Sequence, residues 1–448
     1  MRTIFITCIR GIIARNILAT GAFRILRDRQ DFRIILLAPT TRVAILQKEF
    51  GAPNVEVAGL KTPPLKGMDL ILWTISTNLL WSGTREVQRR AKLARDGNYF
   101  DYLVSKIFAF FGRFYPIRYA FRLVYAKLDP GDEFDELFRC YRPDLFFSTD
   151  IYDIWDMKLV RAAKRHHTPV VGMVRSWDNV TSKTLLNIIP DYMLVNAGRI
   201  REELIAYGDI PAEKITIIGV PHYDHYRDPN ERTPRSDFIK QFGLDPTKPL
   251  ILFVPPSDRY LKGDPVAPLV METVVPLGAS MLIRMPLVGK SELEGMKPPP
   301  NVAFDMPSNS SEFTEVHFDR AADRHLADSL SASDLVIAWA SSMIIDAVVF
   351  DKPVVLVGFD KNPRHYGNSI QQYYDYDHQK RIIETGGCWL AESPEELATI
   401  VREYLQDPSR DRAGRVAIVR EYCDVLDGKS GVRLADVLVG VLARDVRT

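Results

Sequence analysis

The chain has 448 residues, of which 46% are apolar and 26% are charged, so it is neither disordered, nor collagen-like, nor a disulfide-stapled miniprotein. Its net charge of +1 argues against a nucleic-acid binder, because bulk phosphate contacts need a basic excess. The four cysteines have no metal-binding spacing, and we interpret them as reduced, mostly buried thiols of a cytoplasmic protein without a metal site.

Short β-branched runs alternate with helical patterns, which predicts parallel strands covered on both faces by helices. The expected strands lie at residues 3–7, 33–37, 144–148, 170–173, 191–195, 216–218, 250–254, 280–284, 335–338, 354–357 and 388–390. Among the expected helices are those at residues 15–27 and 200–207. Residues 227–249 have the composition of a linker. The sequence therefore predicts an α/β protein of two doubly wound, Rossmann-like domains facing across a cleft. Their ranges are 1–230 and 231–425, followed by a C-terminal helix at 426–448.

Ligands in such folds bind at the carboxyl ends of strands, so the loops there are the first candidates for a site. Neither domain carries a dinucleotide fingerprint or a Walker A motif. After the first strand, Arg10 and Gly11 are candidates for binding an anionic acceptor, and the alternative is an ordinary surface turn. Asp150, which follows the strand at 144–148, is a candidate acceptor ligand and base, or simply the start of the next helix.

A second loop, residues 175–183, follows the strand at 170–173. A carboxylate that faces the cleft can act as a general base, and Asp178 is the candidate. Arg175, Asn179 and Lys183 are candidates for holding an anionic acceptor or stabilising a leaving diphosphate. The alternative is a polar loop with a buried Trp177 anchor and an aspartate helix cap.

In the second domain, an apolar strand runs into Ser341 and Ser342, which open a helix. Free backbone N–H groups and two hydroxyls there are suited to phosphate oxygens of a donor. Asp346 lies about one turn further along and is a candidate for accepting hydrogen bonds from ribose hydroxyls. The alternative is that one of the serines only caps the helix.

Further donor-binding candidates lie in other loops at strand ends. His222 follows a tight Gly-x-Pro turn and is either a ligand of the donor diphosphate or a structural histidine. Ser257 and Arg259 follow one second-domain strand, and Arg284 ends the next. An arginine can pair with phosphate bidentately, although a surface cation is the alternative for both arginines.

These segments, in this order, resemble the nucleotide-diphosphate-dependent glycosyltransferases of the GT-B fold, and in particular the CDP-glycerol glycerophosphotransferase-like group of cell-surface polymer enzymes. The T-W-H-G-T-P-L-K stretch of that group is similar to the segment around Asp178, which stands at the position of the catalytic histidine. Its G-x-P-R-x-D stretch is similar to the segment around His222. Its D-Y-S-S-x-x-x-D spacing is kept from Ser341 to Asp346, and its R-x-H-P is matched at Arg284 without the histidine.

The resemblance covers about residues 140–430 and implies an inverting transfer of a sugar, or of a polyol phosphate, from a nucleotide-activated donor to a cell-surface glycan or lipid-linked acceptor. It implies that the donor binds the second domain, that Asp178 is the base, and that no metal or other cofactor is needed. One alternative is a UDP-sugar 2-epimerase-like isomerase, which would need paired carboxylates that the sequence does not reveal. Another is a non-catalytic scaffold, since the family histidines are missing.

Residues 85–127 have ten basic side chains against three acidic ones, together with eleven aromatic residues. We expect a helical insertion here. Basic helices with aromatic faces can lie on anionic membrane surfaces, so this insertion is a candidate for membrane association. The alternative is an aromatic core stripe with solvated cations. The sequence therefore predicts a cytoplasmic protein, peripheral at the inner face of the cell membrane, without a transmembrane helix.

Overall fold

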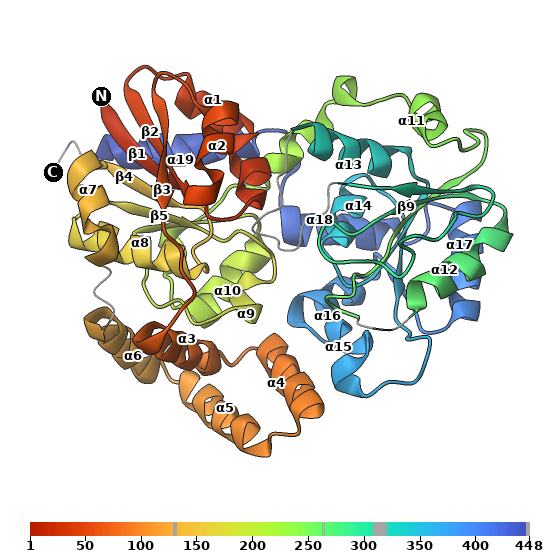
Figure 1. Ribbon diagram of the computed structural model, residues 1–448, viewed down its shortest axis with the longest axis horizontal. Coiled ribbons are helices and arrows are strands. Elements are labelled where there is room, and N and C mark those ends of the chain that lie inside the picture. The colour runs from red at the N-terminus through yellow and green to blue at the C-terminus, as the bar shows by residue number, and fades with distance from the viewer. Residues whose placement is uncertain (129–131, 262, 264, 308–319, 445–448) are drawn as a thin grey trace. The chain divides into compact units, whose positions relative to one another are not determined.

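The computed structural model describes residues 1–128, 132–261, 263, 265–307 and 320–444 (Figure 1). The chain divides into two compact units. The first comprises residues 1–86, 98–227 and 422–448, and the second comprises 87–97 and 228–421. The predicted domain boundaries lie after residues 230 and 425, whereas the boundaries between the two units lie after residues 227 and 421. The predicted 85–127 insertion is divided between the units.

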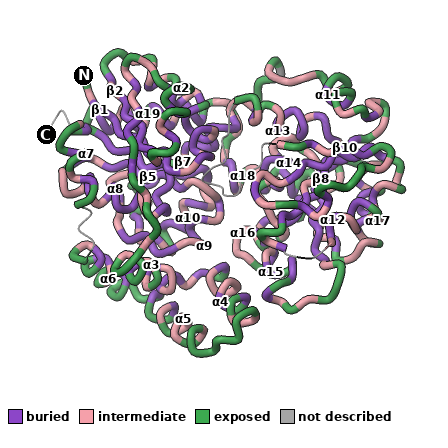
Figure 2. Tube along the Cα trace, viewed as in Figure 1, coloured by how far each residue is buried: buried purple, intermediate pink, exposed green. Residues whose placement is uncertain are grey.

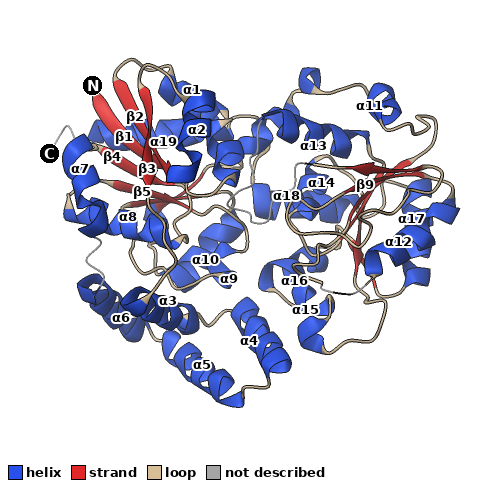
Figure 3. Cartoon of the chain, in the orientation of Figure 1, coloured by secondary structure: helices blue, strands red, loops and turns tan. Residues whose placement is uncertain are grey.

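Within the described residues, the first unit contains a seven-stranded parallel sheet in the order β3-β2-β1-β4-β5-β6-β7 (Figure 3). Its strands are β1 (Arg2–Thr7), β2 (Phe32–Pro39), β3 (Val55–Leu60), β4 (Leu145–Ser148), β5 (Val170–Met173), β6 (Tyr192–Val195) and β7 (Ile215–Ile217). Most strand residues are buried, as the near-continuous apolar runs predicted. The sequence analysis missed β3, whose apolar run is interrupted by Glu56 and Gly59.

The first unit also contains helices. They are η1 (Ala14–Leu18), α1 (Gly21–Arg27), η2 (Thr40–Arg42), α2 (Val43–Phe50), α3 (Gly67–Leu79), α5 (Tyr99–Gly112), α6 (Tyr115–Leu128), η3 (Asp132–Phe134), α7 (Asp135–Tyr141), α8 (Ile154–Arg165), α9 (Asn179–Ser182), α10 (Gly198–Gly208), η4 (Ala212–Lys214), η5 (Pro221–Arg227) and α19 (Ser430–Arg444), while α4 (Gly83–Asp96) belongs to both units. The prediction of one helix at 15–27 was wrong. Thr20 has an extended backbone, and its hydroxyl donates to the carbonyl of Ile17, so the π-helix η1 ends before α1 begins.

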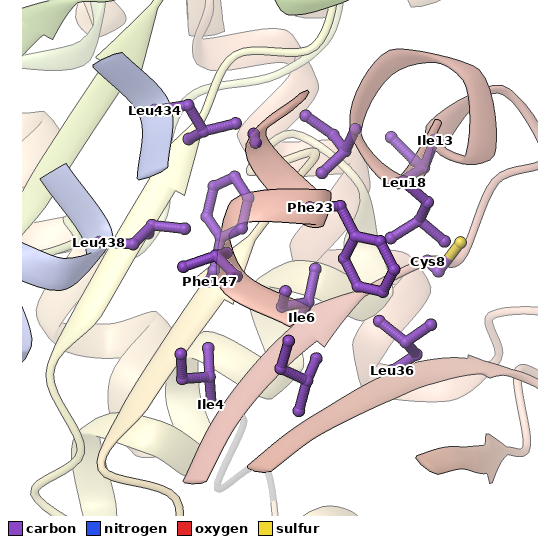
Figure 4. Close-up of a cluster of buried hydrophobic side chains, with 14 of the residues drawn as sticks. Ile4, Ile6, Cys8, Ile13, Leu18, Phe23, Leu36, Phe147, Leu434 and Leu438 are labelled. Carbon is purple, nitrogen blue, oxygen red and sulfur yellow. The ribbon is translucent and has the colours of Figure 1, made fainter. Parts of the chain in front are cut away.

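The C-terminal helix α19 packs back onto the first unit and completes its core (Figure 4). Leu434 and Leu438 lie in one buried cluster with Ile4, Ile6 and Phe147 of β1 and β4. Each fully buried side chain of this size contributes about 1.5–3 kcal/mol relative to an exposed one. The predicted C-terminal helix at 426–448 corresponds to α19, and residues 445–448 lie outside the described residues.

The second unit contains, within the part of the chain that is described, a six-stranded parallel sheet in the order β10-β9-β8-β11-β12-β13. Its strands are β8 (Leu250–Val254), β9 (Ser280–Arg284), β10 (Val302–Asp305), β11 (Leu335–Ala338), β12 (Val354–Val357) and β13 (Trp389–Ala391). The sequence analysis missed β10, a four-residue strand at the sheet edge. The two sheets confirm the predicted pair of doubly wound, Rossmann-like folds.

The helices of the second unit are η6 (Pro229–Glu231), α11 (Arg235–Gln241), α12 (Val266–Val274), η7 (Val275–Leu277), α13 (Arg320–Ala332), α14 (Met343–Val349), η8 (Tyr366–Asn368), α15 (Gln371–Tyr374), α16 (Asp377–Glu384), α17 (Pro394–Gln406) and α18 (Arg412–Cys423). Helix α17 begins with a capping box, in which the Ser393 hydroxyl accepts from the Glu396 backbone N–H. All four cysteines are free thiols; Cys140 is exposed and the other three are buried. Among the described residues, no helix is long and apolar enough to cross a bilayer.

Candidate active site

In the first unit, the strand order reverses between β1 and β4, and ligands of doubly wound sheets bind at such a switch point. The loops there bring together four of the residues predicted from the sequence. Asp150 accepts from Nε of Arg175 at 2.6 Å and from the side-chain amide of Asn179 at 3.2 Å. Arg10 lies 3.5 Å from the same carboxylate. Gly11 is buried in the β1 loop, where its carbonyl accepts a backbone bond of the following turn.

Most charged side chains of this cluster form ion pairs with one another. The Asp150 side chain is 4% exposed, so its ion pairs are shielded from water. Burial acts to lower the pKa of Arg175, but the charge of Asp150 and the hydrogen bond to it raise that pKa overall. Asp150 is therefore an anchor for two guanidinium groups. The sequence left open that Asp150 starts the next helix. Instead, Asp153 caps α8 by accepting a hydrogen bond from the backbone N–H of Trp155.

Two further carboxylates belong to this cluster, and the sequence analysis missed both. Asp153 pairs with Arg10 at 2.9 Å, and burial raises its pKa. Asp156 is completely buried and accepts from the hydroxyls of Thr7 and Ser148, each at 2.6 Å. Burial, and then the nearby charges of Asp153 and Asp150, raise the pKa of Asp156 well above its ordinary value.

Three carboxylates, those of Asp150, Asp153 and Asp156, therefore gather in the first unit, although the sequence had revealed no paired carboxylates. The signal was present in the sequence, because residues three apart at the start of a helix lie on one face. Among the described residues, no group of three His, Cys, Asp or Glu side chains has an arrangement that could hold a metal ion.

The predicted base, Asp178, precedes the short helix α9 and is partly exposed. Its Oδ2 accepts from the Ser182 hydroxyl at 2.7 Å, and its negative charge contributes to the raised pKa of Arg175. Lys183 ends the same helix and is half-buried. Trp177 is the buried anchor that the sequence offered as an alternative, because its indole N–H donates to the carbonyl of Tyr422 at 2.7 Å.

The segment from Gly219 to Asp224 secures the C-terminal helix. The Asp224 carboxylate accepts from the backbone N–H groups of Ser430 and Gly431, at 3.0 and 2.7 Å, and so caps α19. Gly219 has a φ of +79°, and a Cβ there would lie 2.5 Å from the Ser430 hydroxyl. The two ends of this motif therefore have a structural role.

His222, within the same motif, belongs to the first unit and is buried. Burial, followed by the positive charges of Arg15 and His225, lowers its pKa well below the ordinary value, so the ring is neutral near pH 7. Its Nε2 is buried without a hydrogen-bond partner among the described residues. His222 lies in η5, which packs against η1 of the segment that follows β1, so that Arg15 is close enough to affect its pKa.

In the second unit, the switch point lies between β8 and β11, and the loops after these strands carry the predicted serines. The hydroxyl oxygens of Ser257 and Ser341 are buried and, within the described part of the chain, have no hydrogen-bond partner. A buried polar atom in this state costs about 1–3 kcal/mol, and such atoms often mark a missing ligand. Ser342 is exposed and makes no capping bond, and Asp346 is buried within α14.

The two candidate arginines of this unit have different surroundings. Arg259 is exposed in the loop after β8. Arg284 is buried and ion-paired with Asp305, its register partner on β10, and Asp305 also contacts Nε2 of His325 at 3.0 Å. Burial opposes the shift, but the hydrogen bond with His325 and the charge of Arg284 lower the pKa of Asp305. The guanidinium expected to bind phosphate therefore already has a carboxylate partner.

An aromatic cluster lies beside these loops and was not predicted. Trp339, which lies two residues before Ser341, has its ring centroid 4.7 Å from that of Tyr260 and 5.6 Å from that of Tyr373. The Tyr373 hydroxyl donates to the Tyr260 carbonyl at 3.1 Å, and this hydrogen bond connects α15 to the loop after β8. In the sequence, the short separation between Trp339 and the serines was the signal that could have predicted this aromatic cluster.

Two doubly wound sheets, each with polar loops at its switch point, define a protein of the GT-B fold, with a likeness to glycosyltransferases. Residues 300–440 match the family model described as CDP-Glycerol:Poly(glycerophosphate) glycerophosphotransferase. The matched segment contains Ser341, Ser342 and Asp346. The resemblance and the GT-B fold inferred from the sequence are thereby confirmed. No curated protein matches this chain.

Solved structures of the same fold cover nearly the whole chain. The S. aureus MnaA–UDP structure is 11% identical, with a TM-score of 0.55 over 99% of this chain and 97% of that one. The UDP-GlcNAc 2-epimerase from Neisseria meningitidis, bound to UDP-GlcNAc, is 11% identical, with a TM-score of 0.54 over 98% and 100%. A variant of the wall teichoic acid polymerase TagF with CDPG is 10% identical, with a TM-score of 0.52 over 99% and 90%. At these identities the likeness establishes the fold.

Proposed function

We propose that this protein is a transferase that moves a sugar or a polyol phosphate from a nucleotide-activated donor to a hydroxyl group of a cell-envelope glycan or lipid-linked acceptor. The observation that carries the proposal is the coincidence of two features on one loop. The loop after β11 lies in the segment matched by the glycerophosphotransferase model, and it holds a buried hydroxyl, that of Ser341, without a partner among the described residues.

In this proposal the nucleotide donor binds at the switch point of the second unit. The hydroxyls of Ser257 and Ser341 donate to phosphate oxygens, and exposed Arg259 adds positive charge. Asp346 and the neighbouring Ser342 complete the set by binding ribose or phosphate oxygens. Arg284 has a structural role, since Asp305 already occupies its guanidinium.

The first unit supplies the acceptor side of the reaction. Lys183 favours an anionic acceptor such as a phosphate-bearing lipid or glycan, whereas Arg10 and Arg175 are already paired with Asp150 and support the loop around it. The acceptor oxygen forms the new bond to the anomeric carbon or to the phosphorus, the bond from that atom to the nucleotide oxygen breaks, and the hydroxyl proton passes to Asp178. Asn179 and Asp150 keep Arg175 oriented. No bound metal or cofactor has a role in the proposed reaction.

The released nucleotide distinguishes the possible reactions. The purified chain is incubated with UDP-, GDP- and CDP-linked sugars and CDP-polyols plus an acceptor extract, and the nucleotides are separated chromatographically. A nucleoside diphosphate indicates sugar transfer, and a nucleoside monophosphate indicates polyol phosphate transfer. Asp178→Asn should lower turnover by at least about 100-fold, the usual contribution of a general base, whereas exposed Asp28→Asn should not. Full turnover by Asp178→Asn would contradict the assignment.

A second candidate, a UDP-sugar 2-epimerase-like isomerase, is favoured by one observation. The carboxylates of Asp150, Asp153 and Asp156 gather at one switch point, and solved epimerases share the fold. We rank it second because Asp150 and Asp153 are bound to arginines and Asp156 to two hydroxyls. The same assay decides, because an epimerase converts one nucleotide sugar into another without an acceptor and without releasing the nucleotide. A chain that binds none of the nucleotides would be a non-catalytic scaffold.

A further inference from the structure

One face of the first unit carries large apolar side chains toward solvent. On α5, five of them follow each other at spacings of three or four residues and therefore share one helix face. They are Phe100, Leu103, Ile107, Phe110 and Phe114, the last just beyond the helix, and they are between 48% and 74% exposed. Figure 2 shows long exposed stretches on α5 and α6. An amphipathic helix normally turns such a face to the core.

The exposed face extends over the two helices that pack with α5. On α6, Tyr115, Tyr119 and Leu123 repeat every four residues and are 51% to 55% exposed. On α3, Met68 and Ile71 are 47% and 52% exposed, although they lie outside the segment that the sequence analysis singled out. We name these ten residues of α3, α5 and α6, together with their helices, the α3/α5/α6 face. A patch of this extent on a soluble protein usually marks an interaction site.

The helices are fixed in this orientation by contacts on their inner sides. Arg118 and Arg122 of α6 both bind the buried carboxylate of Asp209, and Arg122 also donates to the carbonyl of Leu186 at 2.8 Å. Gly112 of α5 approaches α3 so closely that a Cβ would lie 1.8 Å from the carbonyl oxygen of Leu79. The outward apolar side chains are therefore held in place by the fold.

These contacts reduce the number of cations of the 85–127 segment that can face an anionic surface. Arg118 and Arg122 are buried in the ion pair with Asp209 and are not available to an anionic surface. Exposed cations nonetheless border the face: Lys66 precedes α3, Arg113 follows α5, and Lys127 lies near the end of α6.

Acidic side chains nearby are fewer and mostly paired. Asp69 of α3 binds Lys158 at 3.0 Å, and Glu86 binds Lys106 at 2.9 Å. Asp101 in the first turn of α5 is a further exposed acid, so the three border cations outnumber it, while the centre of the face is aromatic and aliphatic.

We propose that the α3/α5/α6 face docks the protein on the surface of an anionic lipid bilayer, with the apolar side chains of α5 and α6 inserted at the headgroup level and Lys66, Arg113 and Lys127 against lipid phosphates. Aromatic side chains are favoured at that depth, and cations at the border add attraction to anionic lipid. A second copy of the chain fits the same face less well. Because a two-fold interface uses the same surface on both copies, it would bring the cation-bearing borders of two copies together.

Vesicle flotation with the full-length chain tests this inference. The probes are vesicles of phosphatidylcholine alone, and of phosphatidylcholine with phosphatidylglycerol in a two-to-one ratio. We expect the chain to float with the anionic vesicles. The triple variant Phe100→Ser, Leu103→Ser, Phe110→Ser should reduce the bound fraction by about tenfold or more, because each exposed side chain forfeits its transfer into the membrane interface.

A control changes exposed apolar residues elsewhere in the same unit, Ile205→Ser on α10 and Val432→Ser on α19, both 43% exposed. This control should float like the unaltered chain. A second variant, Arg113→Glu with Lys127→Glu, should weaken binding to the anionic vesicles only. Melting temperatures show whether each variant is folded, since all these residues are exposed.

Three results would overturn the inference: no flotation of the unaltered chain, equal flotation of the triple variant, or a concentration-dependent dimer that the triple variant abolishes in the absence of lipid. The flotation assay needs neither nucleotide nor turnover. Its failure would therefore leave the proposed transferase activity untouched, and the converse also holds.

Discussion

The switch points of the two units differ in how their polar groups are satisfied. In the first unit, Asp150 is surrounded by Arg10, Arg175 and Asn179, so its charges are compensated inside the protein. In the second unit, the hydroxyls of Ser257 and Ser341 are buried without partners among the described residues. The comparison indicates that the first site is assembled before any substrate arrives, whereas the second is completed by its ligand. The two sites should therefore respond oppositely to the loss of a polar group.

The largest expected effect is on stability in the first unit. Asp150→Ala leaves the largely buried guanidinium of Arg175 without Asp150, whereas Arg10 keeps Asp153, and we expect a loss of about 3–5 kcal/mol in the free energy of unfolding. Urea unfolding followed by circular dichroism measures it. The control is Asp28→Ala, whose side chain is 61% exposed and which should change stability little. A loss below about 1 kcal/mol for Asp150→Ala would show that the cluster is not preassembled.

The second prediction separates stability from binding in the second unit. Ser257→Ala and Ser341→Ala each remove a buried hydroxyl that has no described partner, so the ligand-free chain should keep its stability or gain about 1 kcal/mol. Nucleotide affinity should fall instead, because a hydrogen bond to a charged phosphate contributes about 1.5–3 kcal/mol. Thermal unfolding without ligand and nucleotide titration measure the two quantities. A marked loss of stability without any change in affinity would mean that these hydroxyls are structural.

The third prediction concerns opposite pH dependences of two buried carboxyls. The pKa of Asp156 is raised, so between the unfolded value of about 3.9 and its folded pKa the folded state keeps a proton that the unfolded state has lost. Its contribution to stability therefore falls as pH rises through that window. Asp156→Asn should gain stability relative to the unaltered chain as pH rises above about 4, as measured by denaturant unfolding at each pH.

Asp305 in the second unit should behave in the reverse sense. Its pKa is lowered, so its stabilising contribution is present above about pH 3.9 and is lost as pH falls through its folded pKa. Asp305→Asn should therefore cost more stability at neutral pH than in acid, in the same series of unfolding curves. Parallel pH profiles for the two variants would contradict the assigned shifts.

The sequence was sufficient to predict the fold because buried parallel strands leave near-continuous apolar runs. It failed at β3 and β10, where Glu56 interrupts one run and the other is a short edge strand. It identified Arg10, Asp150, Arg175 and Asn179 as polar residues at strand ends, and the parallel sheet brings such ends together.

The rest of the site depended on contacts that local patterns do not encode. Nothing near Arg284 in the sequence indicates that Asp305 is its register partner, because β10 was not recognised. Likewise, Arg118 and Arg122 look like surface cations until Asp209, far along the chain, is placed against them. Charge counted along a segment therefore overstates the charge available at the surface.

The central claim is that the switch point of the second unit binds the nucleotide of an activated donor. Isothermal titration of the full chain with CDP, UDP and GDP tests it most directly, with Asp178→Asn and the double variant Ser257→Ala, Ser341→Ala measured beside it. We predict that at least one nucleotide binds, that Asp178→Asn keeps the same affinity, and that the double variant binds about tenfold more weakly or worse. Binding of no nucleotide, or equal affinity in the double variant, would contradict the account.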